Sequence, residues 1–161
     1  MAEKGRNILV AVDEGDESAY ALSWCLNNLI SDHNSKDILI LLFAKTPLPI
    51  YSAMDSTGYL FSPSIIETME RCANEVAQKV MDKTTTLCKE LNNQIKVETM
   101  VEHGDPRDVI SEVAERLKVD LLVVGSHGYG AIKRALLGSV SNHCAQNVKC
   151  PVLIVKTPKS N

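Results

Sequence analysis

The sequence predicts an α/β protein built on an open, five-stranded parallel sheet with helices on both faces. Short, continuous apolar runs alternate along the chain with longer segments whose apolar residues recur every three or four positions. Such runs are typical of strands buried on both faces, and the longer spacing is typical of amphipathic helices. Because crossovers between parallel strands are right-handed, the alternation places helices on both faces. The length of 161 residues fits one domain, which we expect to span positions 1–161.

The first half of the chain predicts two strands and two helices. Positions 7–12 are rich in Leu and β-branched residues and end at a polar turn, so they predict a strand. Helical spacing of apolar residues begins at Ser18, and positions 37–44 form a second apolar strand. Positions 47–63 have little periodicity and are a candidate lid or rim, before a long amphipathic helix over 64–91.

The second half predicts three strands and two more helices. Positions 95–101 alternate and predict the third strand. Asp105 and Pro106 predict a helix start, because Asp caps backbone N–H groups and Pro favours the first turn. A fourth strand follows over 119–124, then a loop marked by glycines, a short helix over 139–147 and a last strand over 151–155.

Composition and charge exclude several classes of protein. The formal charge of -3 and the pI near 5.8 give no electrostatic case for nucleic acid or an anionic membrane. No apolar stretch approaches the roughly 20 residues that span a bilayer, and the first apolar run breaks at Asp13, so we expect neither a membrane segment nor a signal peptide. The five cysteines are scattered without a CxxC pair, which favours reduced thiols and a cytoplasmic location.

The topology also predicts where a ligand would bind. Open parallel sheets bind ligands beyond the carboxyl ends of their strands, at the point where the winding direction reverses. Three segments can meet there, namely 11–15 after the first strand, 43–46 after the second and 125–141 after the fourth.

The most informative motif lies in the last of these segments. It comprises Gly125, Ser126, His127 and Gly128, then nine residues, then Gly138, Ser139, Val140 and Ser141. Glycines let backbone N–H groups approach an oxyanion, and a helix start adds unpaired N–H groups and a positive dipole end. The pattern predicts a phosphate cradle to which Ser139 and Ser141 add hydroxyl donors, with Gly125 along a ribose. An isolated pair of such glycines would serve equally well as turns.

Other nucleotide motifs do not fit these residues. A Gly-x-Gly begins at Gly128, but Lys133 stands where the dinucleotide fingerprint requires its third glycine, and no GxxxxGK[ST] sequence is present. By contrast, GSHG, nine residues and GSVS, placed between VDLLVVG and CPVLIVK, resemble the universal stress protein family. The opening NILVAVDEGDESAYALSWCLNNL is similar to plant members, and the resemblance spans essentially the whole chain.

The resemblance implies a Rossmann-like sheet with strand order 3-2-1-4-5 that binds ATP, or AMP or ADP. Gly125, Gly128, Gly138, Ser139, Val140 and Ser141 would line the ribose and phosphates, with Ser126 and His127 beside them. Ala11, Val12, Asp13, Phe43 and Ala44 would face adenine, and Val101 would line the same pocket. The resemblance also implies a homodimer, and the apolar last strand, Val152 to Val155, is an edge that a partner could cover.

Asp13 carries two interpretations. As the residue that ends the first strand, it could bind the nucleotide or support Mg²⁺ through its oxygens. Alternatively, it caps the following helix.

The leading functional hypothesis is a dimeric, nucleotide-dependent switch or sensor in the stress response, with slow ATP hydrolysis as an open addition and no residue assigned to catalysis. An adenylate-forming enzyme is disfavoured because AVDEGDES lacks an SGG-x-DS phosphate loop. The alternative is an interaction or chaperone-like scaffold that uses no nucleotide, and its protein partner would be unknown.

Overall fold

The computed structural model describes residues 4–30, 36–46, 63–126 and 138–158. In chain order the elements are β1 (Asn7–Ala11), α1 (Asp16–Asn28), β2 (Ile38–Lys45), α2 (Pro63–Leu91), β3 (Lys96–His103), α3 (Pro106–Arg116), β4 (Leu121–Ser126), α4 (Ser139–Asn147) and β5 (Val152–Lys156). The strands form one sheet of order β3-β2-β1-β4-β5, in which every neighbouring pair is parallel. The fold class and strand order expected from the sequence are confirmed.

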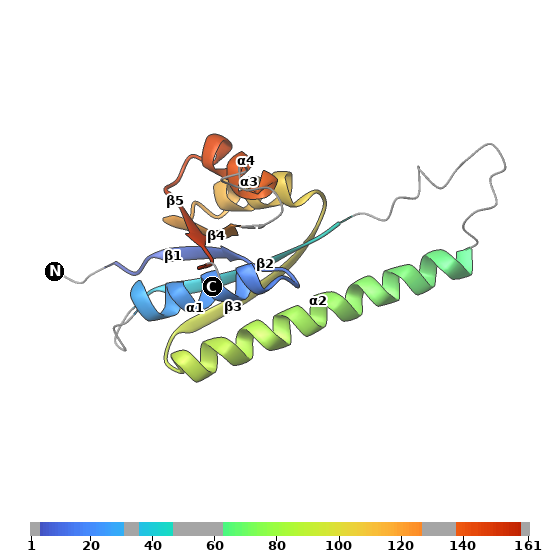
Figure 1. Cartoon of the computed structure of the whole chain (residues 1–161), viewed down its shortest axis with the longest axis horizontal. Helices are drawn as coiled ribbons and strands as arrows, with labels where there is room; N and C mark the ends of the chain where they lie inside the picture. Colours follow the sequence, from blue (N-terminus) through green and yellow to red (C-terminus); the bar gives the residue numbers. More distant parts are fainter. Residues whose placement is uncertain (1–3, 31–35, 47–62, 127–137, 159–161) are drawn as a thin grey trace.

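The helices form two layers on opposite faces of this sheet. Figure 1 shows α1 and α2 below the sheet and α3 and α4 above it. Each face has its own core, and β1 contributes to both, because Ile8 and Val10 pack toward α1 and α2 while Leu9 packs toward α3 and α4. These three side chains are fully buried, as expected of a central strand covered on both faces.

Four strands end later than the apolar pattern predicts. β2 and β3 remain paired to Lys45 and His103, and β4 and β5 remain paired to Ser126 and Lys156. Strand ends are set by the backbone ladder, which polar side chains can continue once their neighbours are fixed. Conversely, α1 begins earlier than expected, at Asp16, because Gly15 serves as its N-cap residue.

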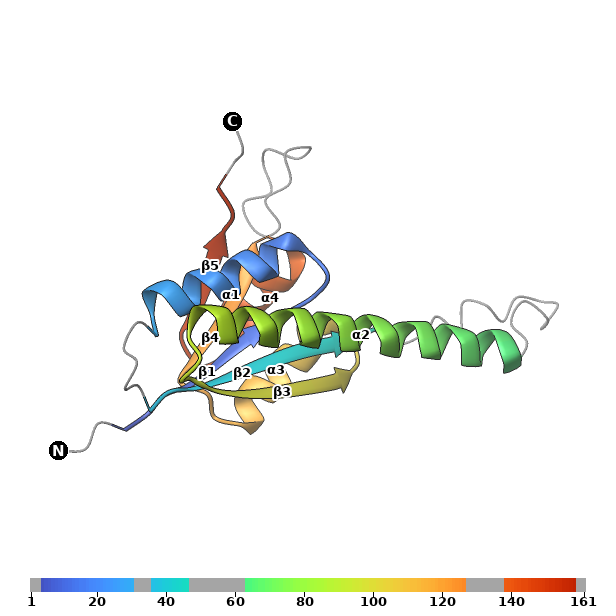
Figure 2. The same ribbon diagram turned by 90° about the horizontal axis from the view of Figure 1, so that it is seen from below.

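The long helix α2 is buried along only part of its length. Its buried residues all lie in the second half, namely Ala77, Val80, Met81, Thr84 and Cys88. Figure 2 shows the first half running out past the sheet. Apart from Pro63, the predicted rim over 47–63 lies outside the described residues.

All five cysteines belong to the described residues, and each is a free thiol, as the sequence predicts. Burial raises the pKa of Cys25 and of Cys88 to about 12, and that of Cys144 to about 11. These thiols therefore stay protonated at neutral pH and act as small apolar core residues. Within the described parts of the chain, no helix is both long and apolar enough to cross a membrane.

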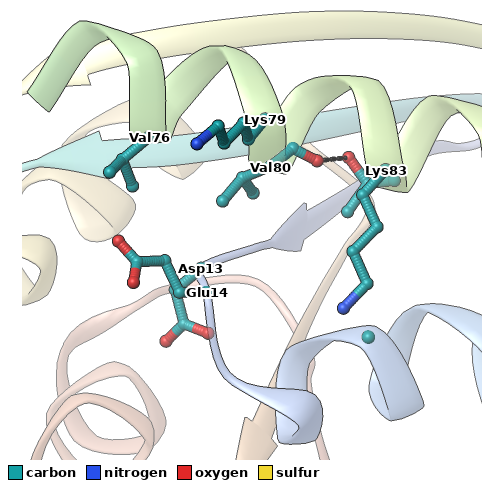
Figure 3. Close-up of a pocket in the computed structure, with 8 residues that line it drawn as sticks. Asp13, Glu14, Val76, Lys79, Val80 and Lys83 are labelled. Carbon is teal, nitrogen blue, oxygen red and sulfur yellow. Dashed lines mark hydrogen bonds between the residues drawn. The ribbon is translucent and has the colours of Figure 1, made fainter. Parts of the chain in front are cut away.

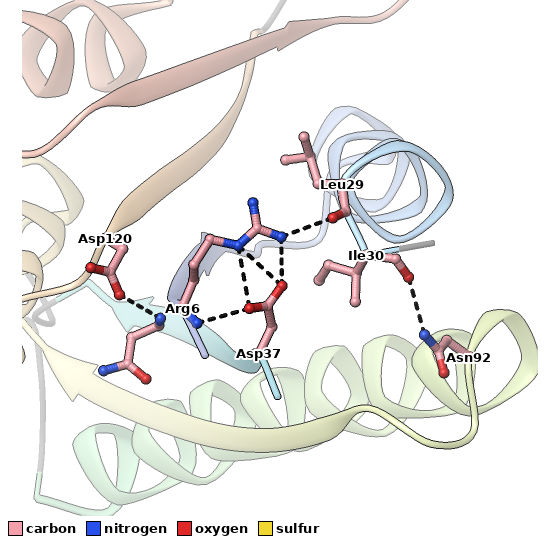
Figure 4. Close-up of polar contacts among 7 residues, drawn as sticks. Arg6, Leu29, Ile30, Asp37, Asn92 and Asp120 are labelled. Atoms are coloured by element: carbon pink, nitrogen blue, oxygen red, sulfur yellow. Dashed lines mark hydrogen bonds and ion pairs between the residues drawn. The ribbon is translucent and has the colours of Figure 1, made fainter. Parts of the chain in front are cut away.

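A polar cluster joins the amino-terminal ends of the central strands (Figure 4). Asp37, just before β2, is almost fully buried and accepts hydrogen bonds from both the backbone N–H and the guanidinium of Arg6, just before β1. The same guanidinium donates to the carbonyl of Leu29, which is the C-cap of α1, at 3.0 Å. Arg6 therefore joins two strand starts to one helix end.

We expect Asp37→Ala to lower the free energy of unfolding by about 2 kcal/mol, because it removes a charged acceptor from several Arg6 donors. The half exposure of Arg6 keeps the loss below that of a fully buried pair. Urea denaturation measures it. The control is Glu115→Ala, which breaks an exposed pair with Lys149 and should cost less than about 1 kcal/mol. Equal losses in the two variants would contradict the role given to Arg6 and Asp37.

Candidate functional site

A cavity of about 100 Å³ lies at the carboxyl ends of β1, β2 and β4. The described residues that line it are Ala11, Val12, Asp13, Glu17, Ser18, Leu42, Ala44, Pro106, Ile110, Val124, Gly125 and Val140. Pockets for small organic ligands usually measure about 300–1,000 Å³. This cavity can therefore enclose one part of such a ligand, and the remainder must lie along its open mouth.

The cavity coincides with the reversal of the winding direction. The chain leaves β1 into α1 on one face and leaves β4 toward α4 on the other, while β1 and β4 are neighbours in the sheet. Helices therefore diverge above adjacent strand ends, which opens a crevice there. Three helix starts border it, through Glu17 and Ser18 of α1, Pro106 of α3 and Val140 of α4.

These three helix starts differ in their suitability for an anion. The first turn of α1 carries Asp16 and Glu17, which would repel one. α3 is already capped by Asp105, which accepts from the backbone N–H of Arg107 at 2.9 Å. Hydrogen bonds from the Arg107 side chain and backbone lower the pKa of Asp105 to about 2, so this cap stays ionised at neutral pH.

The start of α4 has the opposite character. Its N-cap is Gly138, which has no side chain to cap the helix, and its first turn contains no acidic residue. The first N–H groups of any helix lack a carbonyl partner within that helix, and here no carboxylate of the first turn competes for them. Of the three starts, α4 therefore suits an oxyanion best.

The hydroxyls at the start of α4 are not equivalent. Ser141 is buried, and its Oγ donates to the carbonyl of Gly138 at 3.1 Å, so its proton serves the helix start. Ser139 is exposed. Of these two side chains, Ser139 is thus the better placed to meet a ligand in solvent.

Asp13 shapes the turn that enters α1. Its Oδ1 accepts from the backbone N–H of Gly15 at 2.8 Å, and its own N–H donates to Ser18 Oγ at 3.0 Å. Asp13 lies two residues before the N-cap, Gly15, so it stabilises the turn and is not the helix cap itself. Asp13 also lines the cavity.

Gly125 is required by packing as well as by its place in the motif. A Cβ at this position would lie 2.7 Å from the backbone O of Glu17 and 3.2 Å from the backbone N of Ser18. Real side chains do not tolerate such an approach to backbone, so the first turn of α1 can rest on β4 only because residue 125 is glycine.

The structure brings six of the residues predicted for the site to one cavity, namely Ala11, Val12, Asp13, Ala44, Gly125 and Val140. Gly138, Ser139 and Ser141 lie beside Val140 at the start of α4. Ser126 ends β4 and is buried. His127 and Gly128 lie outside the described residues.

Phe43 and Val101 do not line this cavity. They are register partners on β2 and β3, and Phe43 packs in the core beneath α1 and α2, on the other face of the sheet from Ala44. The sequence reasoning in turn missed Pro106 and Ile110 of α3. Their spacing of four residues at a helix start could have indicated a shared face, but not which cavity that face borders.

No cluster of three or more metal-binding side chains occurs within the described ranges. Asp13 and Glu17 are the acidic residues of the described cavity lining. This donor set fits Mg²⁺, which commonly takes one or two carboxylates together with phosphate oxygens and water.

Comparison with known proteins gives the same family from sequence and from structure. The sequence model that describes the universal stress protein family matches residues 5–156 of this chain. A universal stress protein A-like protein of Arabidopsis thaliana is 26% identical over 97% of this chain and 93% of its own length. Universal stress protein YxiE of Bacillus subtilis is 30% identical over 92% of this chain and 97% of its own length. Universal stress protein PHOS34 of A. thaliana is 33% identical over 95% of this chain, which spans only 62% of that relative.

Solved structures with the same fold include two with a bound nucleotide. One is a universal stress protein family protein of A. thaliana with AMP bound, with a TM-score of 0.70 at 23% identity, covering 95% of this chain and 92% of that one. The other is a universal stress protein in complex with cAMP, with a TM-score of 0.63 at 26% identity, covering 95% of this chain and 98% of that one.

We expect Gly125→Ala to lower the free energy of unfolding by about 1–3 kcal/mol, because its methyl group forces the first turn of α1 away from β4. Thermal and urea unfolding measure the change. The matched control is Gly15→Ser, which also adds a Cβ but stands at an N-cap position, with φ of -73° and ψ of 149°, that favours Ser, so it should change stability by about 0.5 kcal/mol at most. If Gly125→Ala were as stable as the control, the close approach of α1 to β4 would be wrong.

Proposed function

The chain belongs to the universal stress protein family, and on that premise we propose that it binds an adenine nucleotide at the carboxyl ends of β1, β2 and β4. One observation carries the proposal. The cavity at these strand ends is mainly apolar, with Ala11, Val12 and Ala44 in its lining, and beside it α4 begins without an acidic side chain. An apolar enclosure next to an anion-compatible helix start suits a ligand that joins a flat ring to a phosphate.

The proposed orientation follows from these two environments. The base lies against Ala11, Val12 and Ala44, and the phosphates point toward the N–H groups of α4. The reverse orientation would bring phosphate toward Asp16 and Glu17 at the start of α1, which is electrostatically unfavourable. The nucleotide complexes of structures with the same fold support this class of ligand.

We keep His127 and Gly128 in the proposed site by their place in the glycine motif. Phe43 and Val101, which do not line the cavity, are left out of it. We propose that Asp13 offers a carboxylate ligand to the Mg²⁺ that accompanies ATP, since Asp13 borders the cavity and Mg²⁺ prefers oxygen ligands.

The proposed chemistry is binding. The described lining contains no histidine or cysteine, and the hydroxyl of Ser18 is held in the turn by the carbonyls of Asp13 and Gly15 at 3.2 Å each. We assign no residue of this lining to catalysis. We propose a regulatory protein of the stress response in which nucleotide occupancy changes the surface offered to partners.

We further propose a homodimer through β5, in the cytoplasm. β5 is an edge strand that pairs only with β4, and Val152, Leu153 and Ile154 are only partly buried. An apolar edge strand is a surface that folded proteins usually cover. The free thiols of the chain support a reducing compartment.

We expect Gly138→Asp to weaken binding of AMP and ATP at least about tenfold, which is about 1.4 kcal/mol, because the new carboxylate stands at the helix start proposed to hold phosphate. Isothermal titration calorimetry measures the affinities. The matched control is Gly138→Asn, because Asn caps a helix as well as Asp does but carries no charge. The Asn variant should lose much less affinity.

Both variants add a side chain of similar size at an extended N-cap position, with φ of -63° and ψ of 159°, so both should fold. If Gly138→Asp bound nucleotide as tightly as the natural chain, phosphate would not lie at α4. If the natural chain bound no adenine nucleotide, the scaffold alternative would replace the proposal.

A further inference from the structure

A second cavity lies on the other side of the turn that follows β1. It measures about 310 Å³, within the range of pockets that bind small organic ligands, and opens between this turn and α2. The described residues that line it are Asp13, Glu14, Ala19, Val76, Lys79, Val80, Lys83 and Thr84 (Figure 3). Only Asp13 also lines the cavity assigned to the nucleotide.

The walls of this cavity carry an apolar surface and opposite charges on separate elements. Figure 3 shows Val76 and Val80 pointing from α2 toward the turn that carries Asp13 and Glu14. Lys79 and Lys83 are on α2, and Lys83 extends toward α1. The lining thus presents two cationic groups from the helix and two carboxylates from the turn.

The ammonium groups of Lys79 and Lys83 are not engaged in ion pairs with other described residues. Among the described residues, five basic side chains pair with carboxylates, namely Arg6, Lys96, Arg107, Arg116 and Lys149. Lys79 and Lys83 form no such pair in the described part of the chain, although Glu75 lies one helical turn before Lys79. Asp82, which is adjacent to Lys83, instead accepts from the side-chain amide of Gln78 at 2.8 Å.

We propose that this cavity binds a small zwitterion with an apolar body, as an apolar amino acid or a short apolar peptide provides. The apolar body lies on Ala19, Val76 and Val80, the carboxylate faces Lys83 with Lys79 adding positive charge to the same wall, and the ammonium group faces Glu14. A simple anion would be attracted by the lysines and repelled by the carboxylates. A simple cation would be attracted by the carboxylates and repelled by the lysines. Only a ligand that carries both charges is complementary to both walls.

The test titrates the full-length protein by calorimetry with L-leucine and with L-leucyl-L-leucine, which distinguishes a free amino acid from a peptide. N-acetyl-leucine and leucinamide are the matched ligands, because each removes one of the two charges. We expect saturable binding of at least one zwitterion at millimolar concentration or below, and at least fivefold weaker binding of both single-charge analogues. The tighter of the two zwitterions identifies the natural size of the ligand.

Variants locate the site. Lys79→Met combined with Lys83→Met keeps the apolar stems and removes both charges, so it should weaken binding of the zwitterion at least tenfold. Lys89→Met, on the exposed face of the same helix and outside the cavity lining, should leave binding unchanged. A saturating concentration of AMP should leave the zwitterion bound, because the two cavities share only Asp13 among their described lining residues.

The proposal is overturned if neither zwitterion binds, if an analogue with one charge binds as tightly, or if AMP displaces the zwitterion. Equal affinities of the double variant and of the Lys89→Met control would also overturn it. None of these results bears on nucleotide binding at α4, which is measured with AMP alone.

Discussion

The fold depends on a central strand that is hydrogen-bonded on both sides and covered on both faces. β1 pairs with β2 and with β4, and its Ile8, Leu9 and Val10 are fully buried. The chain must therefore continue from β1 on one face and reach β4 from the other. As a result, α1 lies on one face of the sheet, and α3 and α4 lie on the other. The cavity assigned to the nucleotide opens between them, where the neighbouring strands β1 and β4 end.

The same constraint explains why some residues that shape the cavity also stabilise the fold. Gly125 allows the first turn of α1 to rest on β4, and this turn also forms a wall of the cavity through Glu17 and Ser18. At the opposite edge of the sheet, Arg6 and Asp37 hold the far end of α1 to the starts of β1 and β2. The helix is thus fixed at both ends, and the position of the cavity wall follows from packing before any ligand binds.

Hydrophobic periodicity is sufficient to predict the order of the elements, because four strands are apolar runs, β3 alternates apolar and polar residues, and the helices have apolar faces. It is not sufficient to assign side chains to the cavity. The family resemblance implies that Phe43 and Ala44 both face the base, yet consecutive residues of a strand point to opposite faces, and only Ala44 lines the cavity. Pro106 and Ile110 are missed because the packing of α3 against β2 and α4 is a tertiary contact that local pattern does not encode.

The central claim is that an adenine nucleotide lies between the end of β1 and the start of α4. The most direct measurement is a titration of the ¹⁵N-labelled protein with AMP, followed through its backbone amide resonances. We expect the largest shift changes at Ala11, Val12 and Asp13 and at Ser139 and Val140, with little change at Lys79 and Lys83. No saturable change, or changes concentrated on α2, would contradict the account.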